Sequence, residues 1–108
     1  MEKVKVGMGC TYVSGSDLYA FEVIKVIDEK TNHVIVREMD HQNKVNWPDQ
    51  DYELTSDPNG RQVELQTFHG QLREVVIDPD TKKIHHLKRF WYSHYTLGRA
   101  EYYQDPSF

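Results

Sequence analysis

The stretch YAFEVIKVIDEKTNHVIVREM, residues 19–39, decides the fold class. Its two ends alternate apolar and polar residues with a period of two and are rich in β-branched side chains, which is typical of strands. The polar residues 28–32 between them predict a turn, so the stretch indicates a β-hairpin. The predicted faces comprise Phe21, Val23, Lys25 and Ile27 in the first strand and Val34, Val36 and Glu38 in the second.

Further strand patterns follow this hairpin at short intervals, over residues 62–68, 72–77 and 84–92. Turn sequences precede or separate these strands. In the first turn, Gly60 is expected to take a positive φ. The turn sequences are Asp57-Pro58-Asn59-Gly60, His69-Gly70 and Asp78-Pro79-Asp80-Thr81.

About seven strands in hairpin order predict an all-β fold, either a small antiparallel barrel or a sandwich. The N-terminal part looks like the opening of a Src-homology or Tudor-type barrel, with a short strand, a loop at residues 14–17 and a long bent hairpin. A helix over residues 91–103 stays open as an alternative, because Pro and Gly are nearly absent there. The length of 108 residues predicts one domain over residues 1–108.

Composition narrows the class of protein. Hydrophobic residues make up 38% of the chain and charged residues 28%, which suits a folded globular protein. No apolar run approaches the length of a membrane span, and the N-terminus lacks the apolar core of a signal peptide. The one cysteine, Cys10, predicts a reducing compartment. We therefore expect a cytoplasmic protein.

Charge is distributed unevenly along the sequence. The formal net charge is −4, and residues 1–60 hold six Lys and Arg against eleven Asp and Glu. Residues 61–108 hold seven against six, and residues 81–100 contain no acidic residue. An acidic or phosphate-bearing partner is therefore expected at this acid-free segment. Its cations and aromatic residues are Lys82, Lys83, Lys88, Arg89, Arg99, Phe90, Trp91, Tyr92 and Tyr95.

The acid-free segment supplies most of the predicted binding residues. Exposed aromatic rings flanked by cations bind bases by stacking and phosphates by charge. The alternative is an ordinary strand with one core face and one solvated face, whose lysines discourage edge pairing. The predicted ligand- or partner-binding residues are Lys88, Arg89, Trp91, Tyr92 and Arg99, together with Asp17 from the N-terminal loop.

The sequence contains no pattern typical of catalysis or of a bound cofactor. His85 and His86 are adjacent, so in a strand they point to opposite faces and do not form a metal-binding pair. Cys10 lies in a β-type stretch, which favours a packed thiol over a nucleophile. Phosphate-loop, nucleophile-elbow and dinucleotide motifs are absent. We predict no metal, no cofactor and no enzymatic activity, with an unfamiliar site around Asp17 and Cys10 as the enzymatic alternative.

Several short motifs lie along the chain. They are Val6-Gly7-Met8-Gly9-Cys10-Thr11, Ser16-Asp17, Pro58-Asn59-Gly60 and Tyr102-Tyr103 followed by Asp105-Pro106-Ser107-Phe108. Together these motifs resemble a family of small proteins of unknown function encoded by tailed phages and prophages. The sequence departs from the family pattern at Cys10, where Ala is expected, and at Leu72, where Trp is expected. The resemblance implies a phage accessory protein.

Together these observations predict a non-enzymatic, phage-type accessory binding protein. Its partner is expected to be a nucleotide or nucleic acid that it sequesters, or a host protein, such as a defence protein, that it blocks. The alternative is a structural or oligomerising protein-interaction module with no small ligand. We expect no membrane contact, we allow for a homo-oligomer, and a phage-encoded protein would act in the host cytoplasm.

Overall fold

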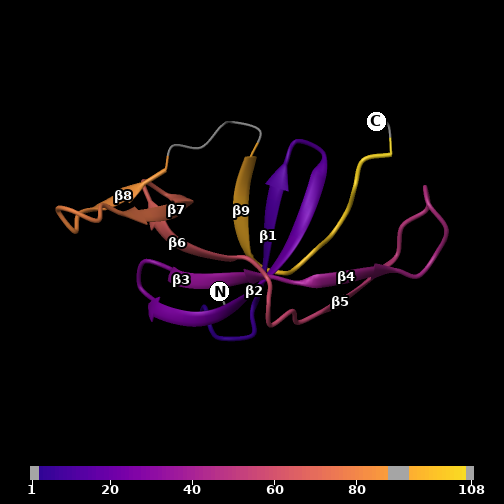
Figure 1. The fold of residues 1–108 in the computed structure, drawn as a ribbon, viewed down its shortest axis with the longest axis horizontal. Coiled ribbons are helices and arrows are strands. Elements are labelled where there is room, and N and C mark those ends of the chain that lie inside the picture. The colour runs from indigo at the N-terminus through magenta and orange to yellow at the C-terminus, as the bar shows by residue number, and fades with distance from the viewer. Residues whose placement is uncertain (1–2, 88–92, 107–108) are drawn as a thin grey trace.

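The residues that the structure describes form nine β-strands (Figure 1). The computed structural model describes residues 3–87 and 93–106, and none of these residues is helical. The predicted all-β fold is therefore confirmed. The strands are β1 (Gly9–Ser14), β2 (Asp17–Asp28), β3 (His33–Glu38), β4 (Asp40–Asn43), β5 (Tyr52–Thr55), β6 (Gln62–Phe68), β7 (Gln71–Ile77), β8 (Ile84–His86) and β9 (Ser93–Gly98).

Seven of these strands pair into one main sheet, in the order β8-β7-β6-β3-β2-β1-β9, while β4 and β5 pair with each other. All of the pairings are antiparallel. Only Met39 separates β3 from β4, and β6 returns beside β3, so the β4–β5 pair extends a long hairpin beyond the main sheet. We call residues 40–55 the arm, and Figure 1 shows it running away from the sheet toward one end of the molecule.

Alternating residues of the central strands build the core. Successive side chains along a strand point to opposite faces, so every second side chain lies on the inner face of the bent sheet. Val34 and Val36 share this face, as the sequence predicts, and both are buried. Tyr95 of β9 extends this cluster and is 7% exposed. The largest fully buried side chains are Phe21, Leu65, Val23, Val34, Val36 and Cys10.

The predicted face of β2 is wrong in the second half of the strand, because the strand contains a β-bulge. Ile24 has no partner in β3, since its two neighbours pair with consecutive residues of that strand. The extra residue shifts the alternation by one position. As a result Val26 packs against the core, whereas Lys25 and Ile27 are exposed.

Two turns show different uses of glycine. His69 and Gly70 both take positive φ values, 51° and 73°, and join the paired residues Phe68 and Gln71 in a two-residue hairpin loop. Gly60 donates the expected hydrogen bond to the Asp57 carbonyl (3.0 Å), but it does not take the predicted positive φ. Its role is steric, because a Cβ atom at Gly60 would collide with the carbonyl oxygen of Glu38.

Residues 93–98 decide the alternative that the sequence left open near the C-terminus. They form β9, which pairs along its length with β1, so the helical alternative is wrong for these residues. The strand predicted over residues 84–92 is present as β8 at Ile84–His86, and residues 88–92 lie outside the described part of the chain.

The two ends of the bent sheet approach each other without pairing, so the sheet is not closed into the predicted barrel. β9 is one edge strand and β7 lies next to the opposite edge. The Tyr95 hydroxyl of β9 nevertheless donates a 2.7 Å hydrogen bond to the Glu74 carboxylate of β7. Burial, together with this carboxylate, raises the pKa of Tyr95. A side-chain contact therefore joins the ends of the sheet where backbone pairing is absent.

We expect Tyr95→Phe to lower the free energy of unfolding by about 2 kcal/mol, because the Glu74 carboxylate loses its buried donor. Urea unfolding followed by circular dichroism measures this change. Tyr12→Phe is the matched control, since its ring lies 4.6 Å from the Tyr95 ring but its hydroxyl has no hydrogen-bond partner among the described residues. Equal losses in the two variants would contradict a stabilising role for this hydrogen bond.

Candidate functional site

The structure describes two of the six predicted binding residues, Asp17 and Arg99. Lys88, Arg89, Trp91 and Tyr92 lie outside the described residues. Asp17 begins β2, and its carboxylate accepts a 2.8 Å hydrogen bond from the backbone amide of Asp105. Arg99 follows β9 and lines a hollow beside the arm. Asp17 and Arg99 are therefore associated with the C-terminal segment, which we define as residues 99–106.

The opposite end of the molecule, formed by β6, β7 and β8, carries a stack of aromatic and cationic groups. The His86 ring stacks on the Phe68 ring with centroids 4.3 Å apart and an angle of 11° between the planes. The Arg73 guanidinium lies 5.5 Å from the Phe68 ring centroid. His86 Nε2 lies 2.8 Å from the side-chain oxygen of Gln66, which fixes the orientation of the imidazole.

We call this surface the basic end. The absence of acids in residues 81–100 pointed to its lysines and to His85 and His86, but no sequence pattern pointed to Phe68 or Arg73, which come from a different hairpin. His85 points away from His86, as predicted, and no group of three or more metal-ligating side chains occurs in residues 3–87 and 93–106. The basic end comprises Phe68, His69, Arg73, Lys82, Lys83, His85 and His86.

Apolar side chains beside the basic end are also exposed. β8 is an edge strand of only three residues, and its Ile84 pairs with Ile77 of β7. These two isoleucines are 49% and 50% exposed. An edge strand with exposed apolar side chains is able to pair with a second chain.

The second surface lies between the arm and the C-terminal segment, and it starts at a close backbone approach. A Cβ atom at Gly9 would collide with the backbone of Arg99 and Ala100, so glycine allows the C-terminal segment to cross β1. Just beyond this crossing, the Thr11 hydroxyl donates to the Arg99 carbonyl (2.6 Å) and accepts from the Glu101 amide (3.1 Å).

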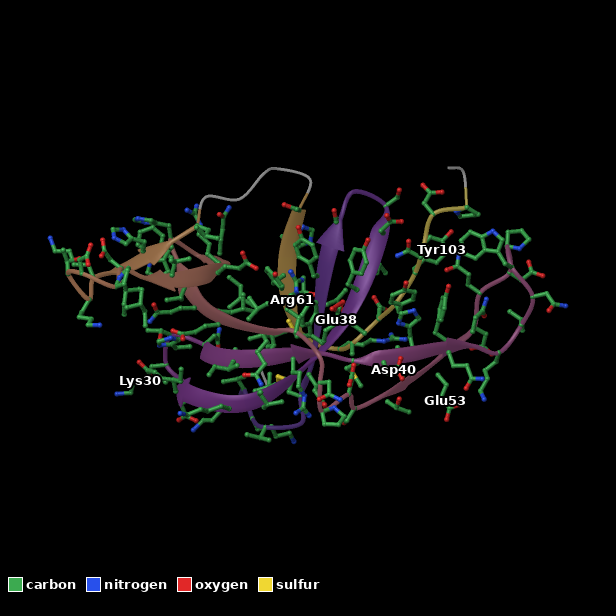
Figure 2. All side chains as sticks on the ribbon, in the orientation of Figure 1. Lys30, Glu38, Asp40, Glu53, Arg61 and Tyr103 are labelled. Atoms are coloured by element: carbon green, nitrogen blue, oxygen red, sulfur yellow. The ribbon has the colours of Figure 1, made fainter. Side chains whose placement is uncertain are left out.

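Backbone hydrogen bonds then hold the C-terminal segment between the main sheet and the arm. Leu18 of β2 and Tyr103 exchange two of them, at 2.8 and 3.0 Å. On the other side, the Gln50 side chain donates to the Gln104 carbonyl (2.6 Å) and accepts from the Gln104 amide (2.8 Å). Gln50 thus replaces the backbone of a neighbouring strand, and it ties the arm to the segment. Figure 2 shows Tyr103 on the same side of the molecule as Asp40 and Glu53 of the arm.

An open hollow of about 360 Å³ remains between these elements, and we call it the tyrosine hollow. The rings of Tyr52 and Tyr102 stand 4.6 Å apart at an angle of 72°. The His41 ring stacks on Tyr102, with centroids 3.6 Å apart. The residues that line the tyrosine hollow include Asp51, Tyr52, Arg99, Glu101, Tyr102 and Tyr103.

The surroundings of the tyrosine hollow are electronegative. Burial raises the pKa of Tyr102, and the Tyr52 and Tyr19 hydroxyls and the carboxylates of Asp17 and Glu38 raise it further. Burial also raises the pKa of Tyr52. No sequence pattern predicts this hollow, because its walls come from segments about fifty residues apart that only the fold brings together.

Comparisons of the chain with family models, with curated proteins and with solved structures find no match. The part of the chain that the structure describes contains no helix long and apolar enough to cross a membrane.

Cys10 is the one thiol in the sequence, and it is fully buried in the core of the main sheet. Burial raises the pKa of the thiol to about 12, so the thiolate is strongly disfavoured. The predicted burial of Cys10 is confirmed. A buried, protonated thiol is a poor nucleophile.

This shift makes stability depend on pH. The thiol pKa is about 8.5 in an unfolded chain and higher in the folded protein, so the stabilisation is complete below pH 8.5 and is lost as the pH rises. Between pH 8.5 and 9.5, below the ordinary tyrosine pKa of about 10, we expect the free energy of unfolding to fall by about 1 kcal/mol. Urea titrations across this range measure the slope. Cys10→Ala is the control and should remove the slope, whereas the same slope in both proteins would contradict the assignment to Cys10.

Proposed function

We propose that the chain is a non-enzymatic binding protein whose basic end takes an anionic, ring-bearing ligand, either a nucleotide or a single-stranded nucleic acid. The observation that carries the proposal is the Arg73, Phe68 and His86 stack on an exposed part of the sheet. Stacked rings with adjacent cations provide the two contacts such a ligand needs, one for a base and one for a phosphate.

The charges around the stack support the same ligand. Residues 62–87, which form β6, β7, β8 and their turns, hold three Lys and Arg and three of the six histidines against four Asp and Glu. Two of the four acids have close partners, because Glu64 lies 2.7 Å from His33 and Glu74 accepts a hydrogen bond from Tyr95. Lys82 and Lys83 are exposed in the turn before β8. The exposed ammonium groups of Lys82 and Lys83 therefore provide the phosphate contacts of the proposed ligand.

The described residues also support binding over catalysis. The thiol is buried, and the titratable side chains of the basic end do not form a nucleophile–base pair with an orienting partner. In a phage accessory protein, such binding would sequester a host nucleotide signal or cover single-stranded nucleic acid.

A second candidate function is a protein-interaction module, favoured by the exposed Ile77–Ile84 pair on the edge strand β8. Such a module would add a strand from a second chain to this edge. The two candidates differ in their dependence on salt and on protein concentration, which makes them distinguishable in solution.

The test is fluorescence anisotropy with a labelled oligothymidylate at low salt, together with a thermal-shift panel of mono-, di- and cyclic nucleotides. We expect the double variant Lys82→Glu/Lys83→Glu to weaken oligonucleotide binding by at least about tenfold and to reduce the salt dependence, because two phosphate contacts are lost. Phe68→Leu should weaken binding by about 1–3 kcal/mol without changing the salt dependence, because it removes stacking alone.

The matched control is Lys3→Glu/Lys44→Glu, which changes the net charge equally at residues outside the basic end. Equal weakening in the control and in Lys82→Glu/Lys83→Glu would contradict the basic end as the site. No response to any nucleotide, combined with a mass that rises with protein concentration in sedimentation, would favour the interaction module instead.

A further inference from the structure

We propose that the tyrosine hollow between the arm and the C-terminal segment binds an alkylammonium group, as carried by a lysine side chain or by a free polyamine. This site differs from the basic end in position and in the charge of its ligand, and it does not depend on the function proposed above.

The walls of the hollow suit a cation. Tyr52 and Tyr102 line it with planes 72° apart, so two aromatic rings meet at a corner. His41 covers one face of Tyr102 at 3.6 Å, and it lies 5.7 Å from Tyr52. These separations and the 4.6 Å between the tyrosines form a nearly right-angled triangle at Tyr102, so Tyr52 stands beside the Tyr102 ring rather than over it. Tyrosine faces attract ammonium groups through the ring quadrupole.

Carboxylates complete the recognition. Asp51 lines the hollow, is exposed, and has no ion-pair or hydrogen-bond partner for its carboxylate among the described residues. Glu101 lines the hollow from the C-terminal segment. The arm, residues 40–55, holds four acids against one lysine, Lys44, and that ammonium is already paired with Glu53 at 2.8 Å. An incoming cation therefore meets an excess of negative charge, whereas an anion is repelled.

Arg99 lines the tyrosine hollow and forms an ion pair with Glu101. Its Nε lies 3.4 Å from Glu101, and its side chain is 84% exposed. An exposed ion pair of this kind is weak, so an ammonium group that also contacts the tyrosine rings replaces it. Arg99 therefore acts as an internal competitor at this site rather than as the anion-binding residue that the sequence suggested. The hollow, at about 360 Å³, is large enough to admit the end of a lysine side chain.

The test is a titration followed by backbone amide NMR of the whole chain. Three probes are compared: lysine capped at both termini, spermidine, and capped norleucine, which has a similar apolar chain but no charge. We expect the two amines to shift the amides of Asp51, Glu101 and Tyr102, and norleucine to leave them unchanged. Binding by either amine supports the site, and binding by only one of them tells whether a protein lysine or a free polyamine is its ligand.

Variants with effects of opposite sign sharpen this test. Asp51→Asn/Glu101→Gln should weaken amine binding by about tenfold, because both carboxylates are neutralised. Arg99→Gln should tighten it by about threefold, because the internal competitor is removed. The matched control, Asp28→Asn/Glu29→Gln, makes the same change in net charge at the β2–β3 turn and should bind as the parent does. Protection of the Tyr103 amide against hydrogen exchange checks that each variant keeps the C-terminal segment in place.

Three results would overturn the proposal: no localised shifts with either amine, the same shifts with capped norleucine, or weaker amine binding by Arg99→Gln. Failure of oligonucleotide binding at the basic end would leave this titration unchanged, so the two proposals fail separately.

Discussion

The close approach of two backbone segments at Gly9 is the constraint on which the arm and its hollow depend. Glycine lets the C-terminal segment cross β1, where a Cβ atom would collide with Arg99 and Ala100. The crossing allows Tyr103 to pair with Leu18 and Gln104 to bind Gln50. An isolated two-stranded hairpin is only marginally stable in water. These contacts, together with the packing of Tyr102 against the rings of the arm, therefore stabilise the position of the arm.

The crossing also gathers the net negative charge of the chain at one end of the molecule. The longest extent is 49 Å, and Figure 1 places β7 and β8 at one end and the arm at the other. The arm and the C-terminal segment together contain six acids and two Lys or Arg. Their combined formal charge of −4 equals the net charge of the whole chain. The remainder of the chain is therefore neutral overall. We propose that the two ends take ligands of opposite charge for this reason, which the net charge alone conceals.

The regular parts of the fold were predictable because the period of two is a local property. Residues 62–68 match β6, and the buried faces of Val34 and Val36 follow from alternation alone. The bulge at Ile24 was not predictable, since it depends on how β2 pairs with β3. The reason for Gly60 was also hidden, because the collision it avoids involves Glu38, a residue in another strand.

The candidate surfaces were predictable only in part. The acid-free segment pointed to Lys82 and Lys83, but Phe68 and Arg73 join them through hairpin pairing across β6 and β7. Arg99 was grouped with these cations by its place in the sequence, and the turn of the chain after β9 instead brings it to Glu101 beside the arm. Contacts between distant segments, such as Gln50 with Gln104, leave no periodic signal in the sequence.

Hydrogen exchange in Gly9→Ala tests the central claim most directly, with Gly7→Ala as its control, since Gly7 has a positive φ but open space around it. The account predicts that the Leu18 and Tyr103 amides lose protection in Gly9→Ala and keep it in Gly7→Ala, while the Val36 amide in the core stays protected in both. Unchanged protection of Leu18 and Tyr103 in Gly9→Ala would contradict the account.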